Sequence, residues 1–236
     1  MTYKCERCKD EGIIQIGTIK YPDGGEYPNF GPCPDCIKRA QEIKAAKHFE
    51  KLFEVSGLHE TEKMRLRDIL PNGVGTGRNV KETRNLMHNG AGFLTLWGTS
   101  GNGKTMILQA LVFEYILRGV PAAYILTYHM LNYIRAAFDS NGRNASDSAI
   151  QRLTNLEKIP VLCIDEVDKF PMTAWEMANF SSIINQRSRG AIEGDQITVL
   201  AMNKKPHTFL DDHFISRFLG LGKILENNDS DWRVKK

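Results

Sequence analysis

The most informative pattern in the sequence is a glycine-rich run that ends in a lysine and a threonine. It matches the phosphate-binding pattern G-x-x-x-x-G-K-[ST] at every specified position. Its residues are Gly98, Thr99, Ser100, Gly101, Asn102, Gly103, Lys104 and Thr105. Because glycines have no Cβ, successive backbone N–H groups can converge on phosphate oxygens. We expect Lys104 to neutralise those oxygens and the Thr105 hydroxyl to hold Mg²⁺, so the pattern predicts binding of a nucleoside triphosphate.

Two acids follow an apolar run further along the chain. The run at 161–164 ends in Asp165 and Glu166. After a phosphate loop, we expect Asp165 to hold Mg²⁺ through water and Glu166 to polarise the water that attacks the γ-phosphate. The alternative is an ordinary transition from strand to loop. Asn203 follows a further apolar run at 198–202, and its amide could orient the attacking water or merely cap the strand end.

Four cysteines near the start form two C-x-x-C pairs, which are Cys5 with Cys8 and Cys33 with Cys36. This spacing lets both sulfurs of a tight turn face one tetrahedral Zn²⁺. Two disulfides or a redox-active pair fit poorly, because the chain shows no secretion signal and cytosolic thiols stay reduced. The β-branched run at 13–20 and the turn at 22–25 add a hairpin. We therefore predict a structural zinc ribbon, in which two knuckles clamp a hairpin and metal binding drives folding.

These residues need a scaffold, and from residue 90 onward the sequence alternates strand and helix patterns. The expected strands are 93–97, 122–126, 160–164, 197–202 and 223–225, and the expected helices are 104–118, 128–138 and 173–187. Such alternation predicts an α/β fold with a mostly parallel sheet and helices on both faces. Ligands of such sheets bind beyond the carboxyl ends of the strands.

Length and composition set the organisation of the chain. The 236 residues are divided into a zinc-ribbon module at 1–38, a helical linker at 39–90 and a nucleotide-binding domain at 91–236. Within the linker, we expect 71–77 to be a loop, because it is rich in glycine. No apolar run approaches the ~20 residues that span a bilayer, so we expect a cytoplasmic protein with no membrane partner. The net charge of +3 permits nucleic-acid binding without arguing for it.

The order of these motifs resembles that of AAA+ ATPases. In detail, the chain is similar to the replicative helicase loaders and their transposon relatives, the DnaC/IstB-like family. The segments that carry this similarity are 106–110, 119–125, 131–135, 214–218 and 229–233. The cysteine module is similar to that of loaders from bacteria and their phages. The resemblance extends over nearly the whole chain and is weakest at 56–90.

The resemblance implies roles for two arginines. Arg217 would be an arginine finger that reaches the γ-phosphate held by a neighbouring subunit, and Arg233 would be a sensor-2-like arginine. Family members often carry another arginine four positions before the finger, where this chain has His213. The alternative for either residue is a surface arginine. The resemblance also implies a domain without a full helical lid, and an isolated subunit that hydrolyses ATP slowly because its finger acts in trans.

The leading hypothesis is an ATP-dependent loader of the replicative helicase. Its expected partners are the helicase hexamer, docked on the zinc module, single-stranded DNA, and further copies of the chain across an ATP-bridged interface. Candidate DNA contacts are Tyr128, Arg135, Arg143 and Lys169. The alternatives are a transposition ATPase that delivers target DNA to a transposase and a zinc-ribbon adaptor that uses ATP only as a switch. A small-molecule kinase is disfavoured, because the chain has an acid pair typical of hydrolases and shows no acceptor-binding lid.

Overall fold

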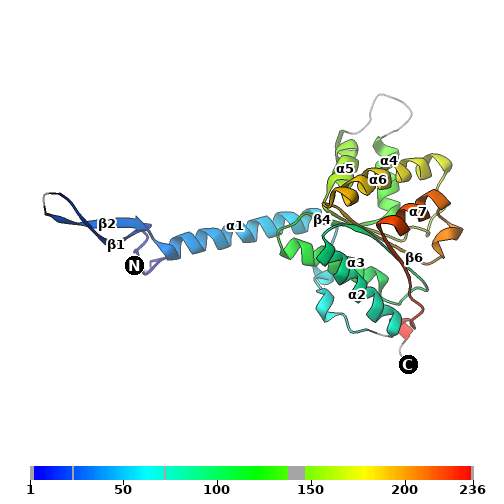
Figure 1. Cartoon of the computed structure of the whole chain (residues 1–236), viewed down its shortest axis with the longest axis horizontal. Helices are drawn as coiled ribbons and strands as arrows, with labels where there is room; N and C mark the ends of the chain where they lie inside the picture. Colours follow the sequence, from blue (N-terminus) through cyan, green and yellow to red (C-terminus); the bar gives the residue numbers. More distant parts are fainter. Residues whose placement is uncertain (1–2, 23, 72, 138–146, 235–236) are drawn as a thin grey trace. The chain divides into compact units, whose positions relative to one another are not determined.

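The computed structural model describes residues 3–22, 24–71, 73–137 and 147–234 (Figure 1). Arg143 therefore lies outside the described residues. The chain forms two compact units, Met1–Lys51 and Leu52–Lys236. Among the described residues, no helix combines the length and the apolar character needed to cross a membrane.

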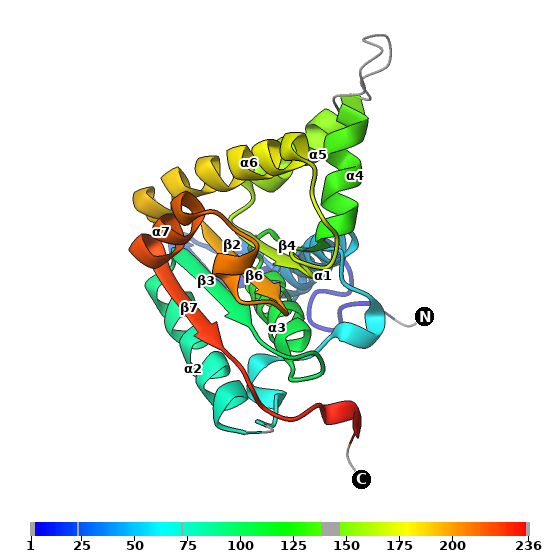
Figure 2. The same cartoon turned by 90° about the vertical axis from the view of Figure 1, so that its right-hand side faces the viewer.

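The larger unit is built on one parallel sheet, with strand order β4-β5-β6-β3-β7. The strands are β3 (Gly92–Trp97), β4 (Ala122–Leu126), β5 (Val161–Asp165), β6 (Ile197–Met202) and β7 (Gly222–Glu226). The helices are α2 (Val74–Asn89), α3 (Lys104–Leu117), α4 (Thr127–Ala137), α5 (Asp147–Lys158), α6 (Ala174–Glu193) and α7 (Asp212–Leu221). Figure 2 shows α2 and α3 on one face and the other helices on the opposite face, which confirms the predicted α/β fold with helices on both faces.

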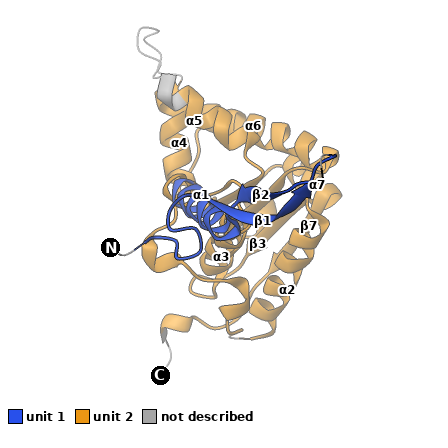
Figure 3. Cartoon of the chain, turned by 90° about the vertical axis from the view of Figure 1, so that its left-hand side faces the viewer, with its two compact units in different colours: residues 1–51 blue, residues 52–236 orange. Residues whose placement is uncertain are grey.

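The smaller unit contains an antiparallel hairpin and most of a long helix (Figure 3). β1 (Ile13–Lys20) pairs with β2 (Glu26–Pro32), as the sequence predicts, and α1 spans Pro34–Val55. The second cysteine pair differs from the predicted knuckle, because Cys36 lies in the first turn of α1. Pro34 explains the difference: proline is favoured at the first position of a helix, where its missing N–H costs nothing.

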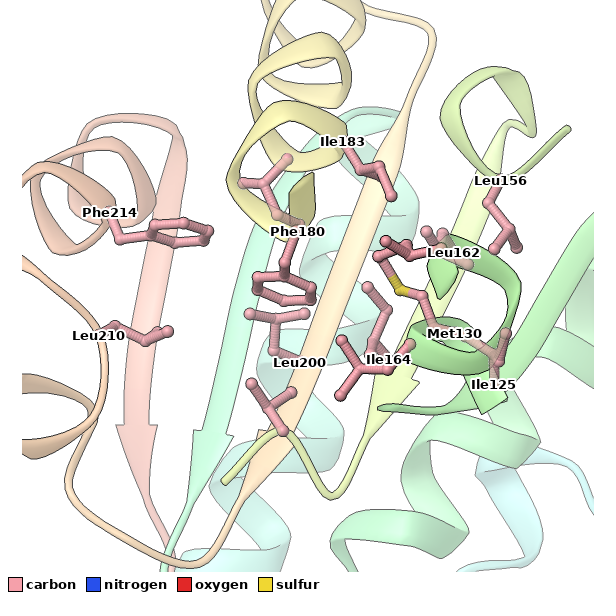
Figure 4. Close-up of a cluster of buried hydrophobic side chains, with 14 of the residues drawn as sticks. Ile125, Met130, Leu156, Leu162, Ile164, Phe180, Ile183, Leu200, Leu210 and Phe214 are labelled. Atoms are coloured by element: carbon pink, nitrogen blue, oxygen red, sulfur yellow. The ribbon is translucent and has the colours of Figure 1, made fainter. Parts of the chain in front are cut away.

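The core of the larger unit forms because its central strands, β5 and β6, are apolar along most of their length. Every residue of β5 and β6 is buried, as expected for a parallel sheet that is covered on both faces. On one face, side chains of α4 and α6 pack onto these strands; Figure 4 shows Met130, Phe180 and Ile183 beside Ile164 and Leu200. This packing holds the carboxyl ends of the strands in register.

The glycine-rich stretch at 71–77 is not a loop throughout, because α2 begins at Val74. Its first turn is capped from far away in the sequence: Asp229 accepts hydrogen bonds from the backbone N–H groups of Gly75 (3.0 Å) and Thr76 (2.6 Å). A Cβ on Gly75 would lie 2.5 Å from Asn227 Oδ1. This glycine thus permits close packing inside a helix, where the local sequence predicted a turn. The remaining short elements are 3₁₀ turns at Glu60–Glu62, Leu66–Asp68, Pro206–Thr208 and Trp232–Val234.

A buried arginine joins α6 to the amino end of the sheet. Arg187 is fully buried, and burial lowers its pKa to about 9. Its guanidinium donates to the carbonyls of Leu156 (2.8 Å), Ile159 (2.8 Å) and Ile197 (2.6 Å), and to the hydroxyl of Thr198 (2.7 Å). One side chain therefore satisfies carbonyls at the end of α5, in the following loop and at the start of β6.

We predict that Arg187→Leu destabilises the larger unit by roughly 3 kcal/mol, because it leaves several buried carbonyls without donors. Urea unfolding followed by circular dichroism measures the change. Arg189→Leu, an exposed position on the same helix, is the matched control and should stay within about 0.5 kcal/mol of the wild type. Equal effects of the two substitutions would contradict the structural role of Arg187.

Candidate nucleotide site and cysteine cluster

A cavity of about 510 Å³ lies where the phosphate loop, Gly98–Thr105, meets the ends of β5 and β6. The predicted site residues that line it are Ser100 to Thr105, Asp165, Glu166, Asn203 and Arg233. Its other walls come from Thr61, Glu62, Met64, Met106, Gln109, Met202 and Trp232. The structure therefore brings the candidate phosphate, magnesium and catalytic residues to one place. Arg217 is not part of this cavity.

The phosphate loop is packed tightly against the segment 227–232. Gly98 has φ 138°, and a Cβ there would lie 2.0 Å from the Asn227 carbonyl oxygen. The side chains of Asn102 and Asn227 each donate to the backbone carbonyl of the other, at 2.5 and 2.9 Å. The N–H of Trp232 adds a bond of 2.9 Å to the Gly101 carbonyl. The shape of the loop thus depends on contacts made by a distant part of the chain.

Lys104 begins α3 and is folded back across the loop. Its ammonium donates to the carbonyls of Gly98 (2.8 Å) and Thr99 (2.7 Å) and to Asn102 Oδ1 (3.0 Å). Burial lowers the pKa of Lys104 to about 8, so the side chain is mainly protonated at neutral pH. Phosphate oxygens entering the loop would find this charge already in position, which fits a nucleotide-binding role.

The carboxylate of Asp165 lies beside the Thr105 hydroxyl, as a magnesium site requires. Thr105 donates to Asp165 Oδ2 at 2.6 Å, and Tyr124 of β4 donates to the same oxygen at 3.0 Å. Burial raises the pKa of Asp165, and these two hydroxyls and the Glu166 N–H counteract the rise. A hydroxyl and a carboxylate are oxygen ligands of the kind that Mg²⁺ prefers, so the residues present fit that ion. No local sequence pattern predicts the contact between Tyr124 and Asp165, which are 41 residues apart in the chain.

Glu166 faces the cavity but is held by a neighbouring cation. Its backbone has φ 54°, in the left-handed region that non-glycine residues rarely adopt. The ammonium of Lys169 donates to both carboxylate oxygens, at 2.7 and 2.8 Å. A carboxylate here can accept a proton from water, and in this structure Lys169 occupies both of its oxygens.

Asp168 is a positioning residue that the sequence analysis missed. It is buried, and its carboxylate accepts from the backbone N–H groups of Asn203 (2.9 Å) and Lys204 (2.6 Å). The N–H of Val167 also donates to the Ala201 carbonyl, at 3.1 Å. These bonds attach the loop after β5 to the end of β6 and so place Asn203 beside the acid pair. A third acid two residues beyond Glu166 was the available signal.

The wall formed by residues 61–64 was also missed, because it falls where the sequence resemblance is weakest. Glu62 accepts from the Gln109 side chain and from the His59 N–H, both at 2.6 Å. Met64 and Met106 add apolar surface to the cavity. The wall thus offers apolar surface, an amide and a carboxylate, which suits the base and sugar of a nucleotide rather than its phosphates.

The two arginines named by resemblance lie in different surroundings. Arg233 lines the cavity, where its guanidinium donates to both oxygens of Asp231, at 3.0 and 2.8 Å. Arg217 is on α7, half buried, and makes no hydrogen bond or ion pair with another described residue. Arg233 therefore borders the cavity, whereas Arg217 lies outside it.

The predicted cysteine ligands converge in the smaller unit. The sulfurs of Cys5, Cys8, Cys33 and Cys36 all lie within 4.8 Å of one another. Cys5 and Cys33 are 3.7 Å apart, and Cys8 and Cys36 are 3.4 Å apart, close to the ~3.8 Å between sulfurs of a tetrahedral zinc site. Hydrogen bonds from the backbone and thiol of Cys8 lower the pKa of Cys5 to about 7. Four thiols in this geometry fit Zn²⁺.

The fold and the site together define a class. A parallel sheet of order β4-β5-β6-β3-β7, with a phosphate loop after β3 and acids at the end of β5, has the fold of AAA+ P-loop domains. More specifically, the chain belongs to the family described as IstB-like ATP binding protein, which matches residues 37–215. The cysteine pairs at 5–36 precede that match.

Individual relatives share this domain at low sequence identity. An insertion sequence IS21-like putative ATP-binding protein of Bacteroides fragilis is 26% identical over 152 residues, which cover 64% of this chain and 56% of that protein. The match to the structure of AMPPCP-bound DnaA from Aquifex aeolicus (TM-score 0.58, 21% identity) covers 70% of this chain and 50% of the DnaA chain. The match to the DnaC helicase loader (TM-score 0.58, 18% identity) covers 71% of this chain and 99% of the loader chain. The chain thus spans about half the length of the first two.

We predict that nucleotide binding takes up a proton at alkaline pH. The pKa of Lys104 is about 8 in the free protein, and nearby phosphate charge would raise it. Proton uptake should therefore increase from roughly 0.1 per ATP at pH 7 to roughly 0.9 at pH 9, and affinity should fall as pH rises through this range. Calorimetry in two buffers of different ionisation enthalpy measures the uptake.

The matched control for this measurement is Lys205→Met, an exposed lysine outside the cavity, which should show the same uptake as the wild type. Binding at pH 9 without proton uptake would show that Lys104 is still charged in the free protein.

Proposed function

We propose that the protein is a Mg²⁺-dependent ATPase that loads the replicative DNA helicase onto single-stranded DNA during replication initiation. The observation that carries the hydrolytic part is the placement of Glu166 and Asp165 opposite Lys104 and Thr105 in one cavity. The loader part is supported by the shared fold with the DnaC helicase loader, which is matched over 99% of its length. We further propose that this activity takes place in the cytoplasm.

In the proposed reaction, a water oxygen attacks the γ-phosphorus of ATP, the bond to the β–γ bridging oxygen breaks, and ADP leaves. Glu166 accepts the proton of the water, and Asn203 orients that water. Lys104 and the N–H groups of the phosphate loop neutralise the charge on the phosphoryl oxygens. Mg²⁺, held by Thr105 and through water by Asp165, would supply further charge neutralisation when bound. Arg233 would contact the nucleotide after separating from Asp231.

We propose that hydrolysis is completed by a second copy of the chain. Arg217 lies outside its own cavity and has no described partner, so it is available to the nucleotide of a neighbouring subunit. A guanidinium placed in this way stabilises the charge on the transferred phosphoryl group. ATP would then bridge two subunits, and assembly would be coupled to nucleotide state.

Arg217→Ala should lower the turnover number by roughly 10³-fold or more. Lys104→Ala should be inactive as well, yet a mixture of the two variants should recover activity, because one supplies the arginine and the other supplies the cavity. Steady-state phosphate release measures both effects. Ser216→Ala, an exposed neighbour on α7, is the control and should match the wild type. A mixture that stays inactive would show that Arg217 does not act across subunits.

The cysteine module is the proposed docking site for the helicase. Four thiols suited to Zn²⁺ hold the base of the hairpin together, in a unit too small to bury a large core. The module precedes the region that the family match covers, so its role need not be shared by every member. We assign it to partner recognition for that reason.

A second function has a specific observation in its favour. The Bacteroides fragilis relative is an insertion-sequence ATP-binding protein. This chain could therefore deliver target DNA to a transposase, using the same ATPase core. An adaptor that uses ATP only as a switch is a further alternative, and it predicts that Glu166→Gln leaves nucleotide turnover unchanged at a negligible level.

Affinity capture from the source lysate should separate the first two functions. Wild-type protein should carry one zinc per chain by elemental analysis and should capture the replicative helicase. Cys33→Ser/Cys36→Ser should lose both the metal and the helicase, because two of four ligands are gone. Cys163→Ala, a buried cysteine of β5, is the matched control and should retain both. Recovery of a transposase instead of the helicase would reassign the protein to transposition.

A further inference from the structure

The contact between Lys169 and Glu166 connects the cavity to an exposed surface. Glu166 lines the cavity, whereas the Lys169 side chain is 52% exposed. The backbone of the intervening loop is fixed by Asp168, which is bonded to Asn203 and Lys204. The Lys169 side chain can thus move while the backbone of its loop stays in place. Among the described residues, Glu166 is the hydrogen-bonding partner of its ammonium.

Exposed aromatic rings lie next to this lysine. The Phe170 ring centroid is 6.0 Å from the Lys169 ammonium and 5.5 Å from the Tyr128 ring centroid. Tyr128 is 47% exposed and Phe170 is 40% exposed. Tyr128 comes from the first turn of α4 and Phe170 from the loop after β5, so two elements present adjoining ring faces. A cation beside exposed rings is the chemistry that binds the phosphates and bases of a single strand.

Of the other candidate DNA contacts, Arg135 is already engaged. Its Nε donates to Glu176 at 2.7 Å and its Nη1 donates to Asn132 at 2.8 Å. Glu176 is buried and caps α6, so releasing Arg135 would disturb that helix. The surface formed by Tyr128, Lys169 and Phe170 is therefore the described group best suited to a polynucleotide.

We propose that Lys169 restrains hydrolysis until single-stranded DNA displaces it from Glu166. Bases stack on Tyr128 and Phe170, and a backbone phosphate takes the ammonium of Lys169. The Glu166 carboxylate oxygens are then free to accept the proton of the attacking water. This inference rests on the proposed function, because it requires Glu166 to be the general base and DNA to be a ligand.

The magnitudes favour such an exchange. An exposed ion pair of this kind shifts an equilibrium by up to roughly fivefold. Stacking one base on an exposed ring strengthens binding by roughly five- to hundredfold. A phosphodiester oxygen also replaces the carboxylate as the acceptor for the ammonium, so the lysine does not lose its partner. Binding of two bases is therefore sufficient to move Lys169.

The test measures ATP hydrolysis by the purified full chain with and without a deoxythymidine oligomer of about 16 nucleotides. Lys169→Met should hydrolyse ATP without DNA roughly two- to fivefold faster than the wild type, with an unchanged KM, and DNA should add little. Lys169→Arg should restore the restraint, because a guanidinium can bind both carboxylate oxygens. Lys158→Met is the matched control, because Lys158 is an exposed lysine before the amino end of β5, whereas the site lies at the carboxyl end.

DNA affinity provides an independent readout by fluorescence anisotropy. Lys169→Met should lower the slope of log affinity against log salt by about 0.7, as expected for one lost phosphate contact. Tyr128→Ala and Phe170→Ala should each weaken binding roughly tenfold with the slope unchanged, because stacking carries no charge. Tighter binding of a uridine oligomer would assign the surface to RNA and overturn the DNA part.

The remaining outcomes separate this inference from the proposed function. A Lys169→Met rate equal to the wild type without DNA, with stimulation by DNA retained, would overturn the restraint alone. A wild type that hydrolyses ATP but neither binds nor responds to the oligomer would overturn the DNA surface and leave the ATPase standing. Wild-type hydrolysis by Glu166→Gln would overturn the proposed general base, whatever Lys169 does.

Discussion

The carboxylate of Asp165 joins three elements of the nucleotide site. It accepts from Thr105 at the start of α3, from Tyr124 in β4, and from the N–H of Glu166 at the end of its own strand. The Thr127 hydroxyl donates to the backbone carbonyl of Asp165 and so links the start of α4 to the end of β5. A buried carboxylate is costly without such donors, and here burial raises its pKa while the donors oppose the rise. The positions of α3 and β4 around the cavity are therefore coupled to one charge, and the start of α4 is bonded to the backbone of the same residue.

That coupling explains why parts of the site were predictable. The phosphate loop, the acid pair and the strands that carry them are local patterns, because apolar runs define buried strands and parallel strands end at the same edge. Asp168 and Tyr124 act through contacts with partners 35 and 41 residues away in the chain, which no local pattern encodes. The prediction of a loop over 71–77 was wrong for the same reason, because α2 begins at Val74 and its cap, Asp229, lies 154 residues further along the chain.

The two compact units are stabilised in different ways. The larger unit buries apolar side chains on both faces of its sheet, together with an arginine that satisfies several carbonyls. In the smaller unit, the buried apolar cluster consists of cysteines with Ile14 and Cys36 packed against it. A metal bound there would contribute directly to folding, whereas a nucleotide would add to a unit that has its own core.

The contacts between the phosphate loop and residues 227–232 have a consequence for biosynthesis. The carbonyls of Gly101 and Asn102 receive hydrogen bonds from Trp232 and Asn227, so the loop gains its full set of supports only after that segment has been translated. Domains generally fold as units during synthesis, so a domain that lacks a supporting segment has not yet reached its final structure. A nascent chain that ends before residue 227 would contain the strands, the glycines and the lysine. It would lack the hydrogen bonds from Asn227 and Trp232 that support the phosphate loop. Completion of the phosphate loop is thereby linked to translation of residues 227–232, a segment far from the loop in the sequence.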